Sequence, residues 1–541
     1  MPLLKIDNKE IEIKSGTTVL QAAEGNGIEI PHYCYHPALQ IVGSCRMCLV
    51  QVEGMPKLQV SCNTFVGDVP PERKVNGKYD MVVDTQNDLV VQERKNILEF
   101  LLLNHPLDCP VCDQAGECYL QDYSFKFGNA HSRFDEAKRV RPNEYLGSQI
   151  VINHNRCIMC SRCVRFTREI SGTSELFVED RGYGSKIAAL EDRPLDNLLA
   201  GNVADICPVG ALLSTDYIHT NRIWNLNMKK SVCQDCSVGC NVEVYAQNDQ
   251  VFRVIARENQ DVNGYFMCDI GRYGFRQFDD HERITSPKIR KEETFTDISW
   301  EGAQKEIYDH FSRSQNGKKP KVAGIASPFH TNETLFMFGR LINNLFKDRG
   351  IMGSFPGIES EEDIVYPSGF RISKDRSPNT QGLKDLCQGL VDDILTTIKE
   401  EKIQYAVILD DRADRTLDES QNEILNQLDY LVVLTYAMTP IAEKAHLILP
   451  GAAPFEREGT LTNDQSRVQW LRRSCKQQGK SRPDWAILME IMNTVGKREL
   501  AYESIGDVIK EMGNRFPAYF GISLFKLGDQ GLLKNGEMKT N

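Results

Sequence analysis

Cysteine is the residue that most constrains what this sequence can fold into. Fifteen of its seventeen cysteines lie between Cys34 and Cys268, in four separate groups. Cysteine-rich sequences that are short and secreted usually form disulfides, but in a chain of 541 residues without a signal-peptide pattern cysteine favours metal or cluster binding. We call the groups packet 1 (Cys34, Cys45, Cys48, Cys62), packet 2 (Cys109, Cys112, Cys118), packet 3 (Cys157, Cys160, Cys163, Cys207) and packet 4 (Cys233, Cys236, Cys240, Cys268).

Packet 3 consists of a tight C-x2-C-x2-C run and a remote Cys207-Pro208. In bacterial ferredoxins the C-x2-C-x2-C-x3-C-P pattern sends its fourth cysteine to a second cluster. Here Thr167 occupies that fourth place, and the places that correspond to the other run before Cys207 hold Asn197, Ala200 and Val203. The two incomplete runs together predict one 4Fe-4S site with the ligands Cys157, Cys160, Cys163 and Cys207. Spacing alone leaves a zinc site open as the alternative.

Packet 2 has three cysteines and needs a fourth ligand. The apolar spacing of residues 88–103 predicts a helix that ends at Asn104-His105-Pro106 and so delivers an imidazole just before the first cysteine. A single histidine is usually an ordinary side chain, but beside an incomplete set of thiolates we expect His105 to bind iron together with Cys109, Cys112 and Cys118. A neutral imidazole in place of a thiolate should make the 4Fe-4S cluster easier to reduce.

Packet 1 follows a predicted hairpin and helix. Residues 3–13 alternate as two strands about Asn8-Lys9, and Thr17-Thr18 can cap a following helix. Plant-type 2Fe-2S ferredoxins combine such elements with C-x4-C-x2-C and a distant fourth cysteine. The first gap here is longer, but the tight Cys45–Cys48 pair is kept, so we expect a 2Fe-2S site at Cys34, Cys45, Cys48 and Cys62.

Packet 4 lies next to two strand-like runs, 241–245 and 251–255. The spacing of its cysteines resembles the 4Fe-4S domain that opens molybdopterin oxidoreductases, and this resemblance implies a third 4Fe-4S site at Cys233, Cys236, Cys240 and Cys268. Fifteen cysteines and His105 then provide four ligands for each of four clusters. Cys387 and Cys475 have no ligand-like neighbours, and we expect them to be ordinary thiols in a core.

Charge and hydropathy exclude several classes of protein. Lys and Arg number 64 against 75 Asp and Glu, a net charge of -11 that argues against a nucleic-acid partner and for protein partners. No apolar run is long enough to span a bilayer, and the first residues resemble neither a signal nor a transit segment, so a cytoplasmic location is expected. The cationic run 138–141 and Arg156, Arg162, Arg165 and Arg168 are expected to be mostly a solvated face, with a few offsetting cluster charge.

Beyond residue 283 short apolar runs alternate with helical stretches, as in an α/β domain. The runs 321–326, 405–409 and 430–434 are expected to be buried parallel strands. Glycine-rich loops in this region are too generic to indicate a nucleotide site.

Several motifs resemble known iron-sulfur families. Residues 31–34 with 43–48, and the histidine-containing motif 104–113, resemble the large iron-sulfur subunit of respiratory NADH dehydrogenases, the 75 kDa subunit family of complex I. Packet 4 and residues 447–463 are similar to molybdopterin oxidoreductases, including formate dehydrogenases. The lysine that links cluster to pterin in the catalytic members is absent from residues 269–273, and the domain is expected to be shortened and free of molybdopterin.

The resemblance implies a multidomain chain of α+β and α/β parts. Its domains would be a β-grasp 2Fe-2S ferredoxin-like domain (1–80), a 4Fe-4S domain with one histidine and three cysteine ligands (81–145), a 4Fe-4S ferredoxin-like domain (146–222), a molybdopterin-type 4Fe-4S domain (226–283) and a molybdopterin-oxidoreductase-like α/β domain (284–541).

The implied function is an electron relay within NADH-quinone oxidoreductase. One 2Fe-2S and three 4Fe-4S clusters would carry electrons from a flavin subunit that binds NADH toward quinone-side subunits, with a further 2Fe-2S subunit as partner and no NADH or quinone site on this chain. The complex would place the chain peripherally on the cytoplasmic side of the bacterial inner membrane. A subunit of an NAD-linked formate dehydrogenase or hydrogenase, and a structural zinc scaffold, are the alternatives.

Overall fold

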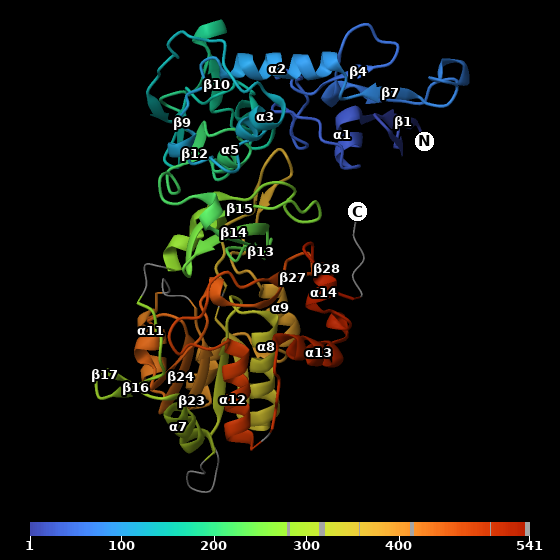
Figure 1. The fold of residues 1–541 in the computed structure, drawn as a ribbon. Helices are drawn as coiled ribbons and strands as arrows, with labels where there is room; N and C mark the ends of the chain where they lie inside the picture. The colour runs from blue at the N-terminus through green and yellow to red at the C-terminus, as the bar shows by residue number, and fades with distance from the viewer. Residues whose placement is uncertain (279–281, 313–319, 356, 412–415, 498, 536–541) are drawn as a thin grey trace. The chain divides into compact units, whose positions relative to one another are not determined.

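The computed structural model describes residues 1–278, 282–312, 320–355, 357–411, 416–497 and 499–535. It divides into two compact units, residues 1–226 with 366–370 and residues 227–365 with 371–541, which we call unit 1 and unit 2 (Figure 1). Parts of the two expected domains 226–283 and 284–541 fall on residues outside the described ranges. Within those ranges, no helix combines the length and apolar character that crossing a membrane requires.

Unit 1 begins with a mixed five-stranded sheet in the order β2-β1-β7-β4-β5. As expected, the first strands form a hairpin, which turns through the left-handed residue Asp7 (φ 50°). Thr18 and Gln21 form a capping box at α1, whose apolar residues are buried in this module as predicted. The elements are β1 (Leu3–Ile6), β2 (Lys9–Glu12), β3 (Thr17–Thr18), α1 (Val19–Glu24), β4 (Leu49–Val52), β5 (Gln59–Val60), β6 (Phe65–Val66) and β7 (Met81–Asp84). Parallel pairing of β1 with β7, with a helix on the sheet, matches the predicted β-grasp arrangement.

The remainder of unit 1 is built from short elements around packets 2 and 3. Its longest helix is α2, which starts at the cap Asn87 and ends next to the histidine motif, as the apolar spacing predicts. The elements are α2 (Asp88–Leu102), α3 (Tyr119–Phe127), β8 (Asn143–Tyr145), β9 (Ile150–Asn153), α4 (Arg162–Glu169), β10 (Leu176–Glu179), β11 (Lys186–Ala189), α5 (Asn202–Asp205) and β12 (Leu212–Ser214). The sheet β12-β9-β8 brings the residues just before packet 3 beside the tail that follows Cys207.

Unit 2 starts with a meander that carries packet 4, followed by an eight-stranded sheet in the order β17-β16-β25-β24-β23-β18-β19-β22. The meander and its helix are β13 (Asn227–Val232), β14 (Asn241–Gln247), β15 (Gln250–Ala256) and α6 (Asp269–Tyr273). The large sheet contains β16 (Lys288–Lys291), β17 (Thr294–Asp297), β18 (Val322–Ala326), β19 (Gly350–Ser354), β22 (Leu390–Val391), β23 (Tyr405–Leu409), β24 (Tyr430–Thr435) and β25 (Leu447–Pro450). The strands predicted at 321–326, 405–409 and 430–434 are neighbours in its parallel centre.

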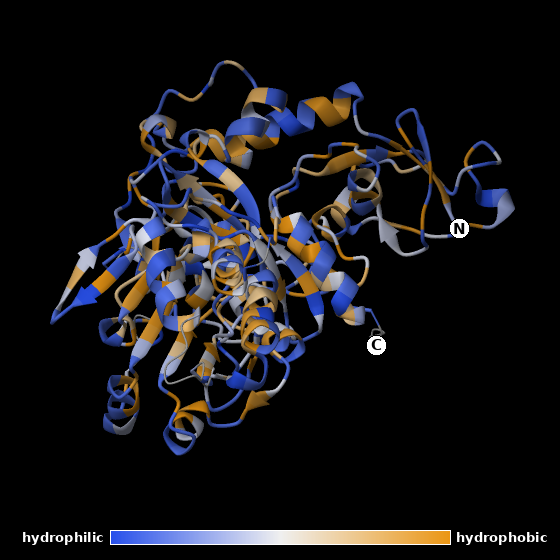
Figure 2. Cartoon of the chain, turned by 90° about the horizontal axis from the view of Figure 1, so that it is seen from below, coloured by the Kyte–Doolittle hydropathy of each residue, from blue (hydrophilic) through white to orange (hydrophobic). Residues whose placement is uncertain are grey.

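Helices cover both faces of this sheet. The side chains of a strand point alternately to opposite faces, so the apolar side chains of one buried strand contribute to a core on each face. Along β23, Tyr405, Val407 and Leu409 join one core, whereas Ala406 and Ile408 join the other. Figure 2 shows hydrophobic and hydrophilic positions mixed along the helices, as expected when each buries one face. The helices are α7 (Trp300–Ser312), α8 (Asn332–Gly339), α9 (Thr380–Leu386), α10 (Ile394–Glu400), α11 (Glu419–Asn426), α12 (Asp484–Gly496), α13 (Ile505–Arg515) and α14 (Leu524–Leu527).

Two small sheets complete unit 2. The strands β26 (Gly459–Thr462), β27 (Arg467–Leu471) and β28 (Leu532–Leu533) form one, and β20 (Ile364–Val365) and β21 (Arg371–Ile372) form the other. Cys387 is buried in the main core and Cys475 is also buried, as expected of ordinary thiols.

Candidate iron-sulfur sites

The structure brings the four thiols of packet 1 together as two pairs. A hydrogen bond from the Cys45 thiol lowers the pKa of Cys34 to about 5, and one from the Cys62 thiol lowers the pKa of Cys48 to about 7. Three of these cysteines are buried. A 2Fe-2S cluster takes four thiolates, two on each iron, so the paired arrangement fits the predicted donor set.

Packet 3 lines a single pocket. Cys157, Cys160, Cys163 and the remote Cys207 all contribute to its wall. The left-handed residues Met159 (φ 54°) and Ser161 (φ 60°) curl the loop before α4, and the Met159 N–H points at Cys157 Sγ at 3.4 Å. Burial raises the pKa of Cys157 to about 12 and that of Cys160 to about 11, so both thiols are neutral near pH 7. A bound cation such as iron favours their thiolate form.

In packet 2 the structure brings the three thiols within electrostatic range of one another. Burial raises the pKa of Cys118, at the start of α3, to about 11. His105 follows the end of α2 as predicted, and burial lowers its pKa to about 4, so its ring is neutral as a metal ligand must be. Within the described part of the chain, His105 makes no hydrogen bond to these thiols, and iron binding by His105 stays a prediction.

Packets 2 and 3 lie against each other. A Cβ atom on Gly210 would lie 2.3 Å from Cys112 Sγ, so only glycine lets the tail after Cys207 pass this close to packet 2. The N–H of Tyr119 donates to Pro208 O at 3.0 Å. Arg156 joins the same two segments, with an ion pair to Asp108 at 2.6 Å and a longer hydrogen bond to Gly210 O at 3.5 Å.

Packets 1 and 3 are joined by two arginines on α4. Arg162 donates to Tyr35 O and to Ile206 O. Tyr35 follows Cys34 of packet 1, and Ile206 precedes Cys207 of packet 3. Arg165 donates to the carbonyls of Cys34 and Cys160. The expectation of a mostly solvated cationic face is therefore wrong for Arg156, Arg162 and Arg165, which are buried because carbonyls and Asp108 take their hydrogen bonds. The only sign of this role in the sequence is that the three arginines lie close to cysteines along the chain.

Packet 4 is collected within unit 2. The N–H of Cys233 donates to Cys240 O at 2.8 Å, and a Cβ on Gly271 would lie 2.4 Å from Cys233 Sγ. All four cysteines are buried, and they raise one another's pKa beyond the effect of burial itself. The α/β part holds this loop through side-chain amides, with Asn463 donating to Val238 O at 3.0 Å and Gln469 to Gly239 O at 2.8 Å.

No group of three or more His, Cys, Asp or Glu side chains among the described residues is arranged to hold a single metal ion. The thiols of packet 3 instead stand around a pocket, and those of packet 1 form separate pairs.

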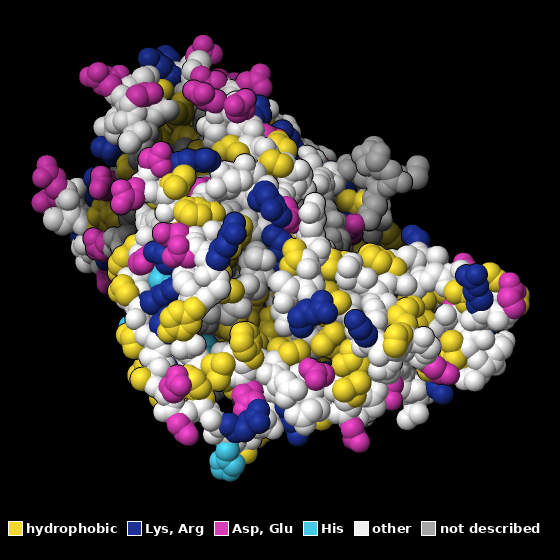
Figure 3. All heavy atoms as spheres, turned by 90° about the horizontal axis from the view of Figure 1, so that it is seen from above, with side chains coloured by type: hydrophobic (Ala, Val, Ile, Leu, Met, Phe, Trp, Pro, Cys, Tyr) yellow, Lys and Arg dark blue, Asp and Glu magenta, His cyan; other side chains and the backbone are white. Residues whose placement is uncertain are grey.

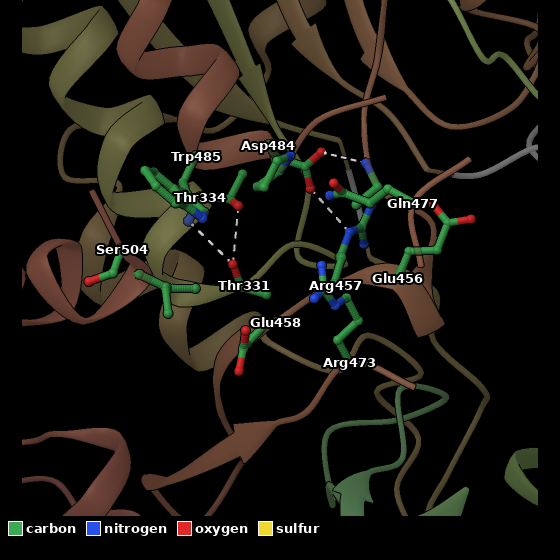
Figure 4. Close-up of a pocket in the computed structure, with 13 residues that line it drawn as sticks. Thr331, Thr334, Glu456, Arg457, Glu458, Arg473, Gln477, Asp484, Trp485 and Ser504 are labelled. Carbon is green, nitrogen blue, oxygen red and sulfur yellow. Dashed lines mark hydrogen bonds and ion pairs between the residues drawn. The ribbon is translucent and has the colours of Figure 1, made fainter. Parts of the chain in front are cut away.

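A further pocket of about 210 Å³ lies in unit 2 beside a buried network of charges (Figure 4). Arg457 bridges two carboxylates, at 2.7 Å from Asp411 and 3.1 Å from Asp484, and His330 lies 3.2 Å from Asp411. Ligand pockets commonly enclose about 300–1,000 Å³, so this one is small for a large cofactor. Of the cationic side chains that line this pocket, Arg457 is already bound to Asp411 and Asp484.

The modules define an iron-sulfur protein built from ferredoxin-like and molybdopterin-oxidoreductase-like parts. Residues 3–68 match the family described as a 2Fe-2S iron-sulfur cluster binding domain. Residues 147–213 match the NADH-quinone oxidoreductase subunit 3 ferredoxin-like domain. Residues 226–280 match the molybdopterin oxidoreductase Fe4S4 domain, and residues 283–373 and 383–494 match molybdopterin oxidoreductase. The chain thus contains both 2Fe-2S and 4Fe-4S binding domains.

The chain resembles the G subunit of NADH-quinone oxidoreductase, as residues 94–133 match the NADH-ubiquinone oxidoreductase-G iron-sulfur binding region. It is 39% identical over 342 residues to the G subunit of Rickettsia felis, which covers 63% of this chain and 49% of that protein. It is 35% identical over 372 residues to the NADH-ubiquinone oxidoreductase 75 kDa subunit of Reclinomonas americana, covering 68% of this chain and 52% of that one. The chain therefore spans about half the length of these curated relatives.

Among solved structures, one match is a chain from the crystal structure of an NAD⁺-reducing [NiFe]-hydrogenase in the H₂-reduced state. It has a TM-score of 0.36 and 31% identity, and covers 41% of this chain and 91% of that chain.

Proposed function

We propose that this chain is an iron-sulfur electron-relay subunit of an NADH-quinone oxidoreductase, and passes electrons from a flavin subunit toward quinone. The observation that carries the proposal is that unit 1 holds three cysteine packets, of which packet 3 is in contact with both packet 1 and packet 2. Arg165 touches the backbone of both packet 1 and packet 3, and Gly210 of the packet 3 tail lies against Cys112 of packet 2. The names of the relatives contain NADH and a quinone, and we take these as the electron donor and the electron acceptor at the two ends of such a relay.

The proposed cofactors are one 2Fe-2S cluster and three 4Fe-4S clusters. Bound clusters would supply one-electron transfer. The 2Fe-2S ligands would be those of packet 1, and the 4Fe-4S ligands those of packet 3, those of packet 4, and packet 2 with His105. We assign no molybdopterin, because the pocket of unit 2 is small and the guanidinium of Arg457 is already bound to Asp411 and Asp484.

The contacts also support an order. Packet 3 touches packet 1 through α4 and packet 2 through Gly210 and Arg156, and we place it as the middle site of the relay on these contacts. The route implied by the resemblance to the 75 kDa subunit family, from packet 1 to packet 3 to packet 2, follows the same contacts. The proposed domains keep the limits 1–80, 81–145, 146–222, 226–283 and 284–541.

Protein partners would cover part of unit 1. Large exposed side chains lie near packet 2, with Phe100 74%, Leu107 87% and Phe125 94% exposed. Hydrophobic side chains are also frequent among cationic ones on the face shown in Figure 3. Exposed apolar surface of this kind commonly marks a protein interface. We propose a flavin subunit that binds NADH, a further 2Fe-2S subunit and quinone-side subunits as partners, no nucleic acid, and a peripheral position on the cytoplasmic side of the inner membrane.

The first test is to purify the full chain without oxygen and to measure its iron and sulfide contents and its EPR spectrum. The second test is to identify the proteins that copurify with the chain from a mild detergent extract. We expect one two-iron and three four-iron clusters per chain, and a flavin subunit among the copurifying proteins. A colourless protein with stoichiometric zinc would instead identify a structural zinc scaffold. Copurification with a formate dehydrogenase or hydrogenase catalytic subunit would favour the other alternative.

A further inference from the structure

We infer that Arg165 is a shared electrostatic and hydrogen-bonding bridge between the clusters of packets 1 and 3, so that one side chain sets the reduction potentials of both and couples them. The inference deepens the proposed function and rests on it, because it takes the cysteines of both packets as cluster ligands.

The geometry of the bridge depends on a single nitrogen atom. Arg165 Nη2 donates to Cys34 O at 2.5 Å and to Cys160 O at 3.4 Å. Each carbonyl belongs to a cysteine that ligates a different cluster in the proposal. Nη1 donates to Gln40 O at 2.6 Å and Nε to Ser161 Oγ at 3.4 Å, so the planar guanidinium is fixed in one orientation between the two loops.

The guanidinium forms no ion pair with a carboxylate among the described residues, and the charge of Glu169 acts on it only at longer range. Arg165 is only 2% exposed, and among the described residues no carboxylate lies within ion-pair distance of it. A buried charge without a counter-charge is costly, and carbonyl dipoles offset that cost only in part. Two anionic clusters on either side would supply the missing negative charge.

Arg162 repeats the arrangement one helical turn earlier. It is 5% exposed, and its guanidinium connects Tyr35 O with Ile206 O, next to Cys34 and Cys207. Arg162 contacts the residues that neighbour the ligands, whereas Arg165 contacts the ligand residues themselves. The strongest effect is therefore expected at Arg165.

Two consequences follow for redox behaviour. A positive charge close to both clusters stabilises their reduced, more negative states, and so raises both potentials. The hydrogen bonds also provide a continuous path between the ligand backbones, because an electron crosses a hydrogen bond more readily than an empty gap. Arg165 is thus a positioning residue for electron transfer between the two sites.

Three variants of the full chain separate charge from bridging. Arg165→Gln removes the charge. Arg165→Lys keeps the charge but has a single nitrogen, which cannot donate to Cys34 O and Cys160 O and also make the contacts to Gln40 and Ser161 that fix the guanidinium between the loops. The matched control is Arg168→Gln on the same helix, where the side chain is exposed and pairs with Glu169. The measurements are EPR-monitored redox titrations and the rate of electron equilibration between the two clusters after photoreduction, each with iron and sulfide contents.

We expect Arg165→Gln to shift the midpoint potentials of both the 2Fe-2S cluster and one 4Fe-4S cluster to more negative values, with Arg168→Gln moving neither. Arg165→Lys should leave the potentials near those of the parent chain but slow the equilibration between clusters several-fold. Unmoved potentials in Arg165→Gln, or movement of only one, would overturn the inference. If Arg165→Gln fails to retain iron, Arg165→Lys decides, and a parental equilibration rate in that variant would overturn it.

Failure of the proposed function has a different signature. The unaltered chain would then lack the two-iron signal or the four-iron signals, whereas failure of this inference leaves all signals present with unmoved potentials.

Discussion

The proposed ligand set of packet 2 depends on the imidazole ring of His105 and on its charge state. Burial keeps this imidazole neutral, and it stands at the end of α2 beside an incomplete set of thiolates. We predict that His105→Cys keeps the cluster but lowers its potential, because a thiolate adds a negative charge. Redox titration of the variant by EPR measures the shift. If potential and signal both stay the same, His105 is not an iron ligand.

Cys207 is the proposed ligand most remote in sequence from the rest of its packet, yet it lines the same pocket as Cys157, Cys160 and Cys163. We predict that Cys207→Ser removes or distorts one 4Fe-4S EPR signal, because serine is a poorer iron ligand than a thiolate. Cys387→Ser is the matched control, since Cys387 lies in an apolar core. Unchanged four-iron signals in Cys207→Ser would contradict the assignment.

Individual residues differ in how far sequence alone could predict them. The thiols of packet 3 are predictable because a short spacing places side chains on one loop, and the incomplete ferredoxin runs point to Cys207. The roles of Arg162 and Arg165 are not predictable, because each arginine binds a backbone carbonyl more than a hundred residues away, and any residue type can provide such a carbonyl. The role of Gly210 could not be predicted from the sequence either, because it depends on the close approach of Cys112 in the folded chain.

At the scale of elements, the start of α8 carries an unusual buried carboxyl group. Glu333 is fully buried, which raises its pKa to about 7, although Thr460 donates to it from its N–H at 2.9 Å and from its hydroxyl at 2.6 Å. The group is therefore harder to ionise in the folded than in the unfolded chain, whose ordinary value is 4.5. The contribution of Glu333 to the stability of the folded chain is fully present below pH 4.5 and is lost as the pH rises toward 7.

We predict that Glu333→Gln removes this loss. The difference in the free energy of unfolding, variant minus parent chain, should rise by roughly 3 kcal/mol between about pH 4 and pH 8. This value follows because each tenfold change in an acid dissociation constant is worth ~1.4 kcal/mol. Denaturant unfolding of both chains at several pH values gives the difference. A difference that does not vary with pH would show that Glu333 ionises normally.

Elements were predictable where the pattern is local. The strands at 405–409 and 430–434 are apolar runs of the right length, and α1 and α2 begin at capping residues. The order of the large sheet could not be predicted, because β16 and β17 extend its edge from a distant part of the sequence. Likewise, no local pattern indicates that β27 supports packet 4 through Gln469.

At the scale of the whole molecule, packet 4 belongs to unit 2, whereas the other three packets belong to unit 1. Its loop is tied to β27 by Gln469 and to residues 371–376 by the Ser237 N–H, which donates to Asp375 O at 2.9 Å. Because a metal site that is absent from the unfolded chain couples binding to folding, the packet 4 cluster should mainly stabilise unit 2.

We predict that Cys236→Ser loosens residues 226–541 and lowers the yield of the assembled complex, while NADH to quinone turnover per flavin stays near normal. Hydrogen exchange of unit 2, complex yield and turnover normalised to flavin measure these effects. Normal yield with collapsed turnover per flavin would place packet 4 on the main electron route.

The carbonyl contacts of Arg165 also bear on how the protein matures. The loop that holds Cys34 is closed by a side chain 131 residues further along the chain. The first module can fold its sheet during synthesis, but the Cys34 loop lacks this closing bond until α4 has been made and folded. On the proposed ligand sets, iron and sulfide delivered early would meet an open loop, and α4 would later close the first site while helping to build the second.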